Sequence, residues 1–320
     1  MTSSELRLFS GTSNPQLASE IAQHLGVPLG NLMSTRFSDG EIRVQIEESA
    51  RGNDIFIIQP TCAPVNDSLM ELLILIDAFR RASAARITCV LPYYGYARQD
   101  KKIKPREPVT ARLVADLLTE SGASRVVCLD LHAQQIQGFF KLPVDHLYAG
   151  PILGRHLMAE GLAGASACVV SPDEGGVRRA LSLAEMLGAR LATIAKRRPE
   201  PNKVEVVEII GDVRDKDCIL IDDMIDTGGS ICHGAEGLMA RGAKSVVACC
   251  THPVFSPGVI DRFAASAIKR VIVTNTIPAT WHDHPWAPNI NVLSVAPLLG
   301  DAIQRIHTGD SVSALFDRNW

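Results

Sequence analysis

The sequence predicts an α/β protein made of two similar doubly wound domains with mainly parallel sheets. Hydrophobic residues make up 46% of its 320 residues and aromatic residues only 5%, which suits parallel strands covered by helices on both faces. A strand–helix–strand unit also occurs twice, beginning at Asp54 and again at Asp217. At this length two domains are the default, and the repeat predicts two copies of one plan.

Charge and cysteine content limit the possible partners and compartments. The formal net charge is −3, so no overall field attracts nucleic acid or an anionic membrane. The eight cysteines lie mostly in apolar runs without C-x-x-C spacing, which predicts small core residues in a reducing compartment. The start shows no signal-peptide pattern, and no apolar run approaches the roughly 18 residues of a membrane span. We therefore expect a cytoplasmic protein.

The first half is expected to alternate short apolar strands with amphipathic helices. One helix, with apolar positions from Leu69 to Phe79, is expected to be capped by Asn66 or Asp67. The predicted strands are residues 6–10, 42–46, 54–59, 87–91 and 126–131, and the other helices are 15–24, 108–120 and 134–140.

The second half repeats this alternation, and the predicted domains are residues 1–148 and 149–306 with a tail at 307–320. An alternative in which the last helix packs back on the first half stays open. The predicted strands are 168–171, 191–195, 204–210, 218–221, 245–250, 270–274 and 291–295, and the helices begin near 177, 229, 258 and 298.

Residues 218–230, C-I-L-I-D-D-M-I-D-T-G-G-S, are the strongest functional signal. Two glycines bring backbone N–H groups close to an anion, Thr227 and Ser230 add hydroxyl donors, and the following helix dipole favours a phosphate. Asp222 and Asp223, at the end of the apolar run, suit sugar hydroxyls or a hydrated Mg²⁺. A Walker loop is excluded, because G-x-x-x-x-G-K-[ST] is absent. The pattern favours phosphate–sugar binding over a structural turn.

Other polar groups also follow predicted strands, where open α/β sheets bind ligands. The segment 98–106 is basic, and both ligand contact and a solvated loop remain open. His132, with Asp130 nearby, is either a satisfied polar residue or a metal or phosphate ligand. Asp173 stands between a strand and a helix, so it is expected to face the same cleft as Asp222.

Two turns complete the candidate segments. Residues 37–41, F-S-D-G-E, predict a β-hairpin turn, in which Phe37 can stack on a base if the turn borders a pocket. Residues 196–203, K-R-R-P-E-P-N-K, predict a flexible loop with a basic start. The repeat places 59–62, Q-P-T-C, where the second copy has its acids and glycines. One half is thus expected to bind the phosphorylated sugar, and the other to serve as scaffold or second-ligand platform.

These motifs occur in series, and the chain resembles the ribose-phosphate diphosphokinases (phosphoribosyl-pyrophosphate synthetases) from near its start to near Phe316. The likeness is greatest to the phosphate-activated bacterial and animal class. The resemblance implies a phosphoribosyltransferase-like fold in both domains and transfer of the diphosphoryl group of ATP to the anomeric hydroxyl of ribose 5-phosphate, with release of AMP, for nucleotide biosynthesis. Mg²⁺ is the implied cofactor.

The resemblance also implies roles for individual residues. ATP contacts fall to the first domain, at Phe37, Asp39, Gly40, Glu41, Arg98, Gln99 and Asp100. Ribose hydroxyls fall to Asp222 and Asp223, and the 5-phosphate to Asp226, Thr227, Gly228, Gly229 and Ser230. His132 and Asp173 are implied to bind Mg²⁺ directly or through water, and Lys196 and Arg198 to close on the phosphates in the transition state.

Regulation and assembly are implied in the same way. Members of the family form hexamers in which phosphate activates and ADP inhibits at a site between subunits. Ser49, Arg51, Ser311 and Ser313 resemble parts of that site, although a solvated loop explains each nearly as well.

Two rival functions remain open at this stage. A phosphoribosyltransferase shares the acidic sugar loop but is usually one domain and leaves Arg98 and Lys196 unexplained. A non-catalytic phosphoribosyl-pyrophosphate-binding regulator would carry a helix-turn-helix module or an altered segment at Lys196, and neither is visible.

Overall fold

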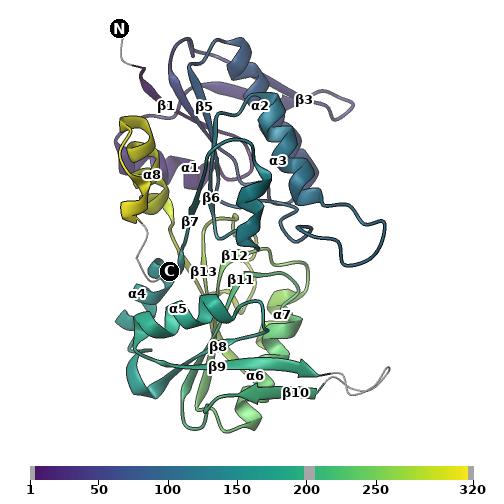
Figure 1. The fold of residues 1–320 in the computed structure, drawn as a ribbon, viewed down its shortest axis with the longest axis vertical. Helices are drawn as coiled ribbons and strands as arrows, with labels where there is room; N and C mark the ends of the chain where they lie inside the picture. Colours follow the sequence, from purple (N-terminus) through teal and green to yellow (C-terminus); the bar gives the residue numbers. More distant parts are fainter. Residues whose placement is uncertain (1–3, 198–205, 316–320) are drawn as a thin grey trace. The chain divides into compact units, whose positions relative to one another are not determined.

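A computed structural model describes residues 4–197 and 206–315 of the chain. These residues form two compact units, each built on its own main sheet (Figure 1). Unit 1 contains residues 4–147, 276–278 and 294–315, and unit 2 contains 148–197, 206–275 and 279–293. The predicted α/β class with mainly parallel sheets is confirmed.

The main sheet of unit 1 has five parallel strands in the order β1-β4-β5-β6-β7. In Figure 1, α1 and α8 lie on one face of this sheet, and α2 and α3 lie on the other. Every residue of β4 is therefore buried, as expected for a strand covered on both sides. The strands are β1 (Leu6–Ser10), β4 (Asp54–Ile58), β5 (Arg86–Leu91), β6 (Arg125–Leu129) and β7 (Val144–Leu147), and the helices are α1 (Pro15–Leu25), α2 (Val65–Arg81), α3 (Thr110–Ser121), α8 (Ala296–Thr308) and the 3-10 helices η1 (Gln134–Phe139) and η4 (Val312–Leu315).

Strands β2 (Leu32–Arg36) and β3 (Ile42–Ile46) form a separate antiparallel pair in unit 1. The predicted hairpin turn at 37–41 is confirmed, because the Phe37 N–H donates to the Glu41 carbonyl at 2.8 Å. Leu32, Val44 and Ile46 pack against the hydrophobic core of unit 1. A two-stranded hairpin is marginal by itself in water, so this one depends on that packing.

The sheet of unit 2 has the order β10-β9-β8-β11-β12-β13-β14, and only β10 runs antiparallel to its neighbour. The chain builds outward from β8 in one direction to β9 and in the other to β11, so the order switches between β8 and β11. Ligands of open α/β sheets bind outside the carboxyl ends of strands at such a switch point. The strands are β8 (Ala167–Ser171), β9 (Arg190–Arg197), β10 (Val206–Ile210), β11 (Asp217–Ile225), β12 (Ser245–Pro253), β13 (Ile268–Thr274) and β14 (Ile290–Leu293).

Helices cover both faces of the unit 2 sheet. One core cluster joins α4 (Gly150–Ala159) and α5 (Val177–Leu187) to one face, and another joins α6 (Gly229–Ala240) and α7 (Val259–Ala264) to the other. The remaining 3-10 helices are η2 (Gly164–Ser166) and η3 (Ala287–Asn289). All eight cysteines are buried and free, as expected for small core residues. Among the described residues, no helix is long and apolar enough to cross a membrane.

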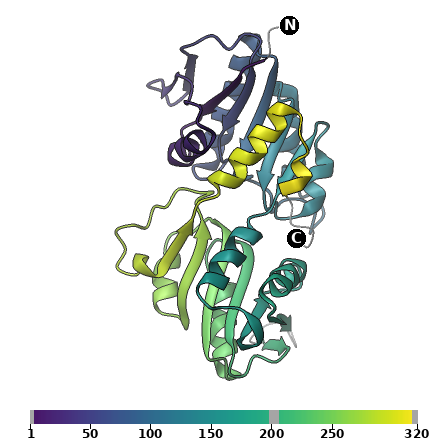
Figure 2. The same cartoon turned by 90° about the vertical axis from the view of Figure 1, so that its left-hand side faces the viewer.

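The last helix differs from the predicted domain bounds, which placed residues up to 306 in the second domain. α8 belongs to unit 1 and lies beside α1, as Figures 1 and 2 show. Its apolar face is buried there, and Gly300 allows the His24 ring to approach closely. Polar contacts hold α8 in unit 1: His24 Nε2 of α1 lies 2.8 Å from Asp301 Oδ1, and His307 Nδ1 lies 2.9 Å from Oδ2 of Asp54 in β4.

Several predicted element ends differ from the structure, and two of them concern α2 and β11. α2 begins at Val65, directly after Pro64, and has no side-chain cap. Asn66 and Asp67, the expected caps, lie within its first turn, where their side chains accept hydrogen bonds from Tyr96 and Arg36 instead. β11 continues to Ile225 rather than ending before the acids, because its pairing with β12 extends to Pro253.

Candidate active site

Asp222 and Asp223 of unit 2 lie in the part of β11 that pairs with β12 on one side but no longer with β8 on the other. β8 pairs with β11 only up to Val170 and Leu220, whereas β12 pairs with it as far as Ile225. Asp222 and Asp223 therefore follow the divergence of β8 and β11, at the switch point of the sheet. Both acids belong to β11, so the prediction that the strand ends before them is wrong, but they do lie beyond its pairing with β8.

Arg179, from the first turn of α5, contacts both acids at once. Its Nη1 lies 3.1 Å from Asp222 Oδ1, and its Nη2 lies 3.3 Å from Asp223 Oδ1. The Asp223 N–H also donates to Asp222 Oδ1 at 2.8 Å. A carboxylate accepts more than one hydrogen bond, so Asp222, the more exposed of the two acids, can accept a further donor such as a hydroxyl in addition to the guanidinium.

Burial and the adjacent Asp223 carboxylate raise the pKa of Asp222 well above its usual value, and Arg179 opposes this shift. The Asp222 side chain keeps 23% of its exposure, against 4% for Asp223, so water weakens the effect without removing it. Asp222 is thus a partly accessible acceptor whose ionised form is disfavoured by its surroundings.

The turn after β11 is held from the side by residues of another segment. Asp226 accepts a hydrogen bond from Ser256 Oγ, and its carbonyl accepts from the Ser256 N–H at 3.2 Å. Arg262 Nη1 donates to the Thr227 carbonyl at 2.7 Å. Asp226 is itself an acceptor, so its carboxylate shapes the turn and cannot donate to a phosphate.

Gly228 is required at the end of this turn. Its φ is 72°, and a Cβ there would lie 2.9 Å from Val259 Cγ2 of α7. α6 begins at the next residue, so its first N–H groups face the same end as the exposed Thr227 and Ser230. A helix N-terminus flanked by hydroxyls is a suitable site for a phosphate dianion.

Asp173 follows β8, the strand beside β11, as predicted. It is exposed, and its Oδ1 accepts a hydrogen bond from the Gly176 N–H at 3.0 Å. An exposed carboxylate of this kind suits a hydrated cation. Its charge contributes to the raised pKa of Asp222, so the two carboxylates act on one region. Lys196 lies near the end of β9, the strand on the other side of β8, and Arg198 lies outside the described residues.

In unit 1, the hairpin presents the predicted nucleotide contacts at its tip. Phe37 is 50% exposed, and the Arg43 guanidinium lies 5.9 Å from its ring centroid. Asp39 Oδ1 accepts from the Glu41 N–H at 3.1 Å, and Gly40 has a φ of 97°. The turn is thus internally hydrogen-bonded while its aromatic ring and acids stay accessible.

The segment after β5 meets the hairpin at one helix end. Tyr96 donates its hydroxyl hydrogen bond to Asn66, the neighbour of the Asp67 that pairs with Arg36 of the hairpin. Gln99 accepts from Thr110 Oγ1, and Asp100 accepts from Gln135 Nε2 at 2.7 Å. Arg98 is exposed at the same loop. The structure therefore brings the two predicted nucleotide segments to the first turn of α2.

His132 follows β6 and is exposed, whereas Asp130 beside it is buried with a φ of 35°. His146 Nε2 of β7 accepts the Leu131 N–H at 2.8 Å and so holds the turn between them. Within the described ranges, no group of three or more His, Cys, Asp or Glu side chains could hold a metal ion alone.

The predicted regulatory residues all lie in unit 1 and are exposed. Ser49 and Arg51 precede β4, and the Ser311 carbonyl accepts from Arg305 Nη1 at 3.1 Å, close to Ser313 in η4. These segments flank the Asp54–His307 contact, which joins the start of β4 to the end of α8.

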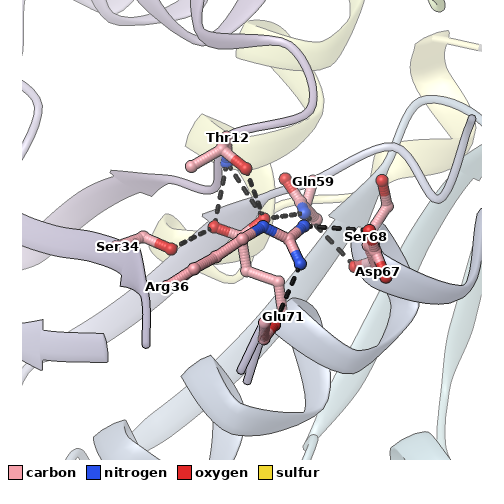
Figure 3. Close-up of polar contacts among 8 residues, drawn as sticks. Thr12, Ser34, Arg36, Gln59, Asp67, Ser68 and Glu71 are labelled. Atoms are coloured by element: carbon pink, nitrogen blue, oxygen red, sulfur yellow. Dashed lines mark hydrogen bonds and ion pairs between the residues drawn. The ribbon is translucent and has the colours of Figure 1, made fainter. Parts of the chain in front are cut away.

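Several residues of this site were missed in the sequence. Arg179, Ser256 and Arg262 stand on elements after β8 and β12, the two strands that flank β11, so the carboxyl-end rule applied to every strand would have found the first two. Glu71, the centre of a buried network in unit 1, gave no signal, since it reads as an ordinary helix residue (Figure 3).

The chain is similar to known proteins over nearly its whole length. Residues 6–122 match the model of the N-terminal domain of ribose phosphate pyrophosphokinase, and residues 193–317 match the phosphoribosyl synthetase-associated domain. The ribose-phosphate pyrophosphokinase of Caldanaerobacter subterraneus subsp. tengcongensis is 57% identical over 311 residues, covering 97% of this chain and 98% of that protein. The one of Brucella melitensis biotype 1 is 54% identical, covering 98% and 100%. The crystal structure of phosphoribosylpyrophosphate synthetase from Mycobacterium smegmatis is 46% identical, with a TM-score of 0.89, covering 95% and 99%.

Proposed function

The chain belongs to the ribose-phosphate pyrophosphokinase family, and from that premise we propose that it transfers the diphosphoryl group of ATP to the anomeric hydroxyl of ribose 5-phosphate. The products are 5-phosphoribosyl 1-diphosphate, for nucleotide biosynthesis, and AMP. The observation that carries the proposal is the switch-point site of unit 2, where two acids and a phosphate-binding helix start are set for a phosphorylated sugar. The phosphoribosyltransferase and non-catalytic alternatives are not favoured, because the relatives named as pyrophosphokinases match 97% to 98% of the chain.

Unit 2 is proposed to bind ribose 5-phosphate. Asp222 and Asp223 accept its ring hydroxyls while Arg179 holds both carboxylates in place. Residues 226–230, with the Thr227 and Ser230 hydroxyls and the first N–H groups of α6, bind the 5-phosphate. The anomeric oxygen then attacks the β-phosphorus of ATP, the bond from that phosphorus to the oxygen of AMP breaks, and the anomeric proton is released. No covalent enzyme intermediate is needed, so rate depends on positioning and on neutralising charge.

Unit 1 is proposed to bind the nucleotide, with Phe37 stacking on adenine and Asp39, Gly40 and Glu41 hydrogen-bonding around it. Arg98, Gln99 and Asp100 lie along the nucleotide by the same proposal. Support comes from Tyr96 and Arg36, which join both segments to the first turn of α2. Lys196 and Arg198 are proposed to neutralise charge on the transferring phosphates.

Mg²⁺ is the proposed cofactor, and the donor set suits it. Mg²⁺ commonly keeps several waters and is bound by one or two carboxylates together with substrate phosphates, so a complete protein cage is not needed. Asp173 offers an exposed carboxylate beside the acids of unit 2, while His132, whose imidazole is a poor direct ligand for Mg²⁺, is assigned a contact through water. When bound, Mg²⁺ neutralises phosphate charge.

Cytoplasmic location, a hexamer, and regulation by phosphate and ADP through Ser49, Arg51, Ser311 and Ser313 are part of the same proposal by family likeness. Mass photometry checks the hexamer. Hyperbolic kinetics that ignore ADP at saturating ATP would contradict the regulation.

AMP release from ATP, measured with and without ribose 5-phosphate, tests the proposed reaction. We expect AMP to form only with the sugar, together with one 5-phosphoribosyl 1-diphosphate per AMP detected by ³¹P NMR. Excess EDTA should abolish the reaction and added Mg²⁺ should restore it. AMP formed equally without the sugar, or none at any Mg²⁺ concentration, would refute the proposal.

A further inference from the structure

Two carboxylates on α2 contact the hairpin that carries the proposed adenine site (Figure 3). Glu71 Oε1 accepts from Ser34 Oγ at 2.6 Å, and Asp67 Oδ2 lies 2.9 Å from Arg36 Nη2. The same guanidinium donates through Nη1 to the Gly40 carbonyl at 3.2 Å. Arg36 therefore links α2 to Gly40 in the hairpin turn, while Ser34 links α2 to strand β2.

The spacing of these contacts matches the geometry of the two elements. Ser34 and Arg36 are two residues apart on β2, so they share one face and stand roughly 6.6 Å apart along the strand. Asp67 and Glu71 are four apart on α2, about 6 Å along the helix and on one face. The neighbours of Ser34 on that face are Leu32 of β2 and Val44, which pairs with Ser34 from β3, and both are apolar and pack on the core. Ser34 and Arg36 are thus the polar side chains of an otherwise apolar face, and each meets an acid.

The Glu71 carboxylate accepts hydrogen bonds from four donor groups of the protein. It is 3% exposed and accepts from Thr12 N at 3.2 Å, Thr12 Oγ1 at 2.7 Å and Gln59 Nε2 at 2.7 Å in addition to Ser34. Thr12 follows β1, Gln59 follows β4 and Ser34 lies on β2, so one carboxylate joins three segments. A buried carboxylate is costly unless its acceptor sites are occupied, which fixes the positions of its donors.

We propose that Asp67 and Glu71 are positioning residues that hold the hairpin on α2 at two points and thereby set Phe37, Asp39 and Glu41 for the nucleotide. This rests on the proposed function, in which the hairpin binds ATP. Neither acid touches ATP: Glu71 is buried, and Asp67 acts through Arg36. Because Asn66 accepts from Tyr96, the same helix turn also fixes the segment containing Arg98. Loss of either tether therefore weakens ATP binding specifically.

Ser34→Ala and Asp67→Ala test the tethers with little risk to the fold. The first leaves the Thr12 and Gln59 bonds to Glu71, and the second removes a 46% exposed side chain. Each should raise KM for ATP and the Kd of a non-hydrolysable ATP analogue by about 5- to 10-fold, and the double variant should raise them more than the product of the two. KM for ribose 5-phosphate and kcat at saturation should stay within about twofold.

Conservative and matched variants provide the controls. Ser34→Thr keeps the hydroxyl and should restore the ATP affinity. Asp77→Asn, on the same helix but paired only with the exposed Arg81 among the contacts found, should leave all constants unchanged. Amide hydrogen exchange of residues 37–41 should accelerate in Ser34→Ala and Asp67→Ala but not in Asp77→Asn.

Phe37→Ala and Asp39→Ala separate the two ways of failing. If they leave ATP affinity unchanged, the assignment of the hairpin to the nucleotide is wrong. If they weaken ATP binding while Ser34→Ala and Asp67→Ala do not, the tethering inference alone is overturned. A parallel rise in both KM values with a lower melting temperature would also overturn it, because it would show a general loss of stability.

Discussion

Unit 1 and unit 2 follow the same strand order at the centre of their sheets and differ at the strand tips. β1-β4-β5-β6-β7 of unit 1 corresponds to β8-β11-β12-β13-β14 of unit 2, and β4–α2–β5 corresponds to β11–α6–β12. The antiparallel pair that follows the first strand joins the main sheet in unit 2 as β9–β10 but forms a separate sheet on α2 in unit 1 as β2–β3. The predicted duplication is therefore visible in topology.

Equivalent positions at the ends of the central strands carry different side chains in the two units. Asp222 in unit 2 corresponds to Gln59 in unit 1, where the acid comes instead from Glu71 of the helix. Glu71 is enclosed by donors of the protein, whereas Asp222 keeps partial exposure and a raised pKa. The same plan thus gives a carboxylate in unit 1 that is buried among donors of the protein, and a partly exposed carboxylate in unit 2 that we propose binds the sugar.

The largest effect is expected from removing the acids that distinguish unit 2. Asp222→Ala combined with Asp223→Ala should lower kcat/KM for ribose 5-phosphate by about 10³-fold or more, since a site built to hydrogen-bond hydroxyls loses its acceptors and leaves Arg179 unpaired by them. Steady-state kinetics measures it. Asp212→Ala, which removes an exposed ion pair with Arg190, is the matched control. A loss below tenfold would show that the acids do not hold the sugar.

The end of β9, the first strand of the antiparallel pair in unit 2, gives the second prediction, because Lys196 lies there. Lys196→Ala should lower kcat by about 10²- to 10³-fold and change both KM values little, since a charge that acts in the transition state is lost. Lys244→Ala is the control, because Lys244 pairs with Asp217 at the start of β11, away from the acids, and this variant should keep normal turnover. Unchanged turnover in Lys196→Ala would contradict its role.

A smaller effect is expected from Arg262 of α7 and from Ser256 in the turn before α7, which hydrogen-bond to the turn after β11. Arg262→Met and Ser256→Ala should each raise KM for ribose 5-phosphate by about tenfold, because the Thr227 carbonyl and the Asp226 carboxylate lose their donors. Isothermal titration with the sugar phosphate checks this. Ser256→Thr should restore affinity. Ser266→Ala, whose hydroxyl donates to the Phe263 carbonyl and accepts from the Ile268 N–H rather than contacting residues 226–230, should not change it. Equal effects of all these variants would point to stability instead.

The smallest effect concerns stability and its pH dependence. Because folding raises the pKa of Asp222, its ionisation destabilises the fold, and this penalty grows as pH rises from the ordinary aspartate range near 4 through the raised value. Asp222→Asn should therefore be more resistant to denaturant than the parent at pH 7 to 8, with an advantage that vanishes near pH 4, although it binds the sugar less well. Urea unfolding across this range measures it. An Asn variant less stable at pH 8 would contradict the assigned shift.

Most of the fold was readable from local pattern. Strands such as β4 and β8 are short, apolar and bounded by turn residues, so their positions are predicted within a residue or two. The predicted N-cap of α2 was wrong because the helix begins earlier, directly after Pro64. The prediction for α8 was wrong because its partner, α1, lies far away in the sequence.

The sequence by itself determined the acidic strand end, the two glycines and the helix start of residues 222–230, because neighbouring residues supply all parts of that motif. Only the tertiary structure decided which distant groups complete each site. Arg179 reaches Asp222 across 43 positions, Ser256 reaches Asp226 across 30, and Thr12 reaches Glu71 across 59. Such contacts depend on sheet order and on the faces that helices turn inward, and both are set by packing of the whole unit rather than by local residue pattern.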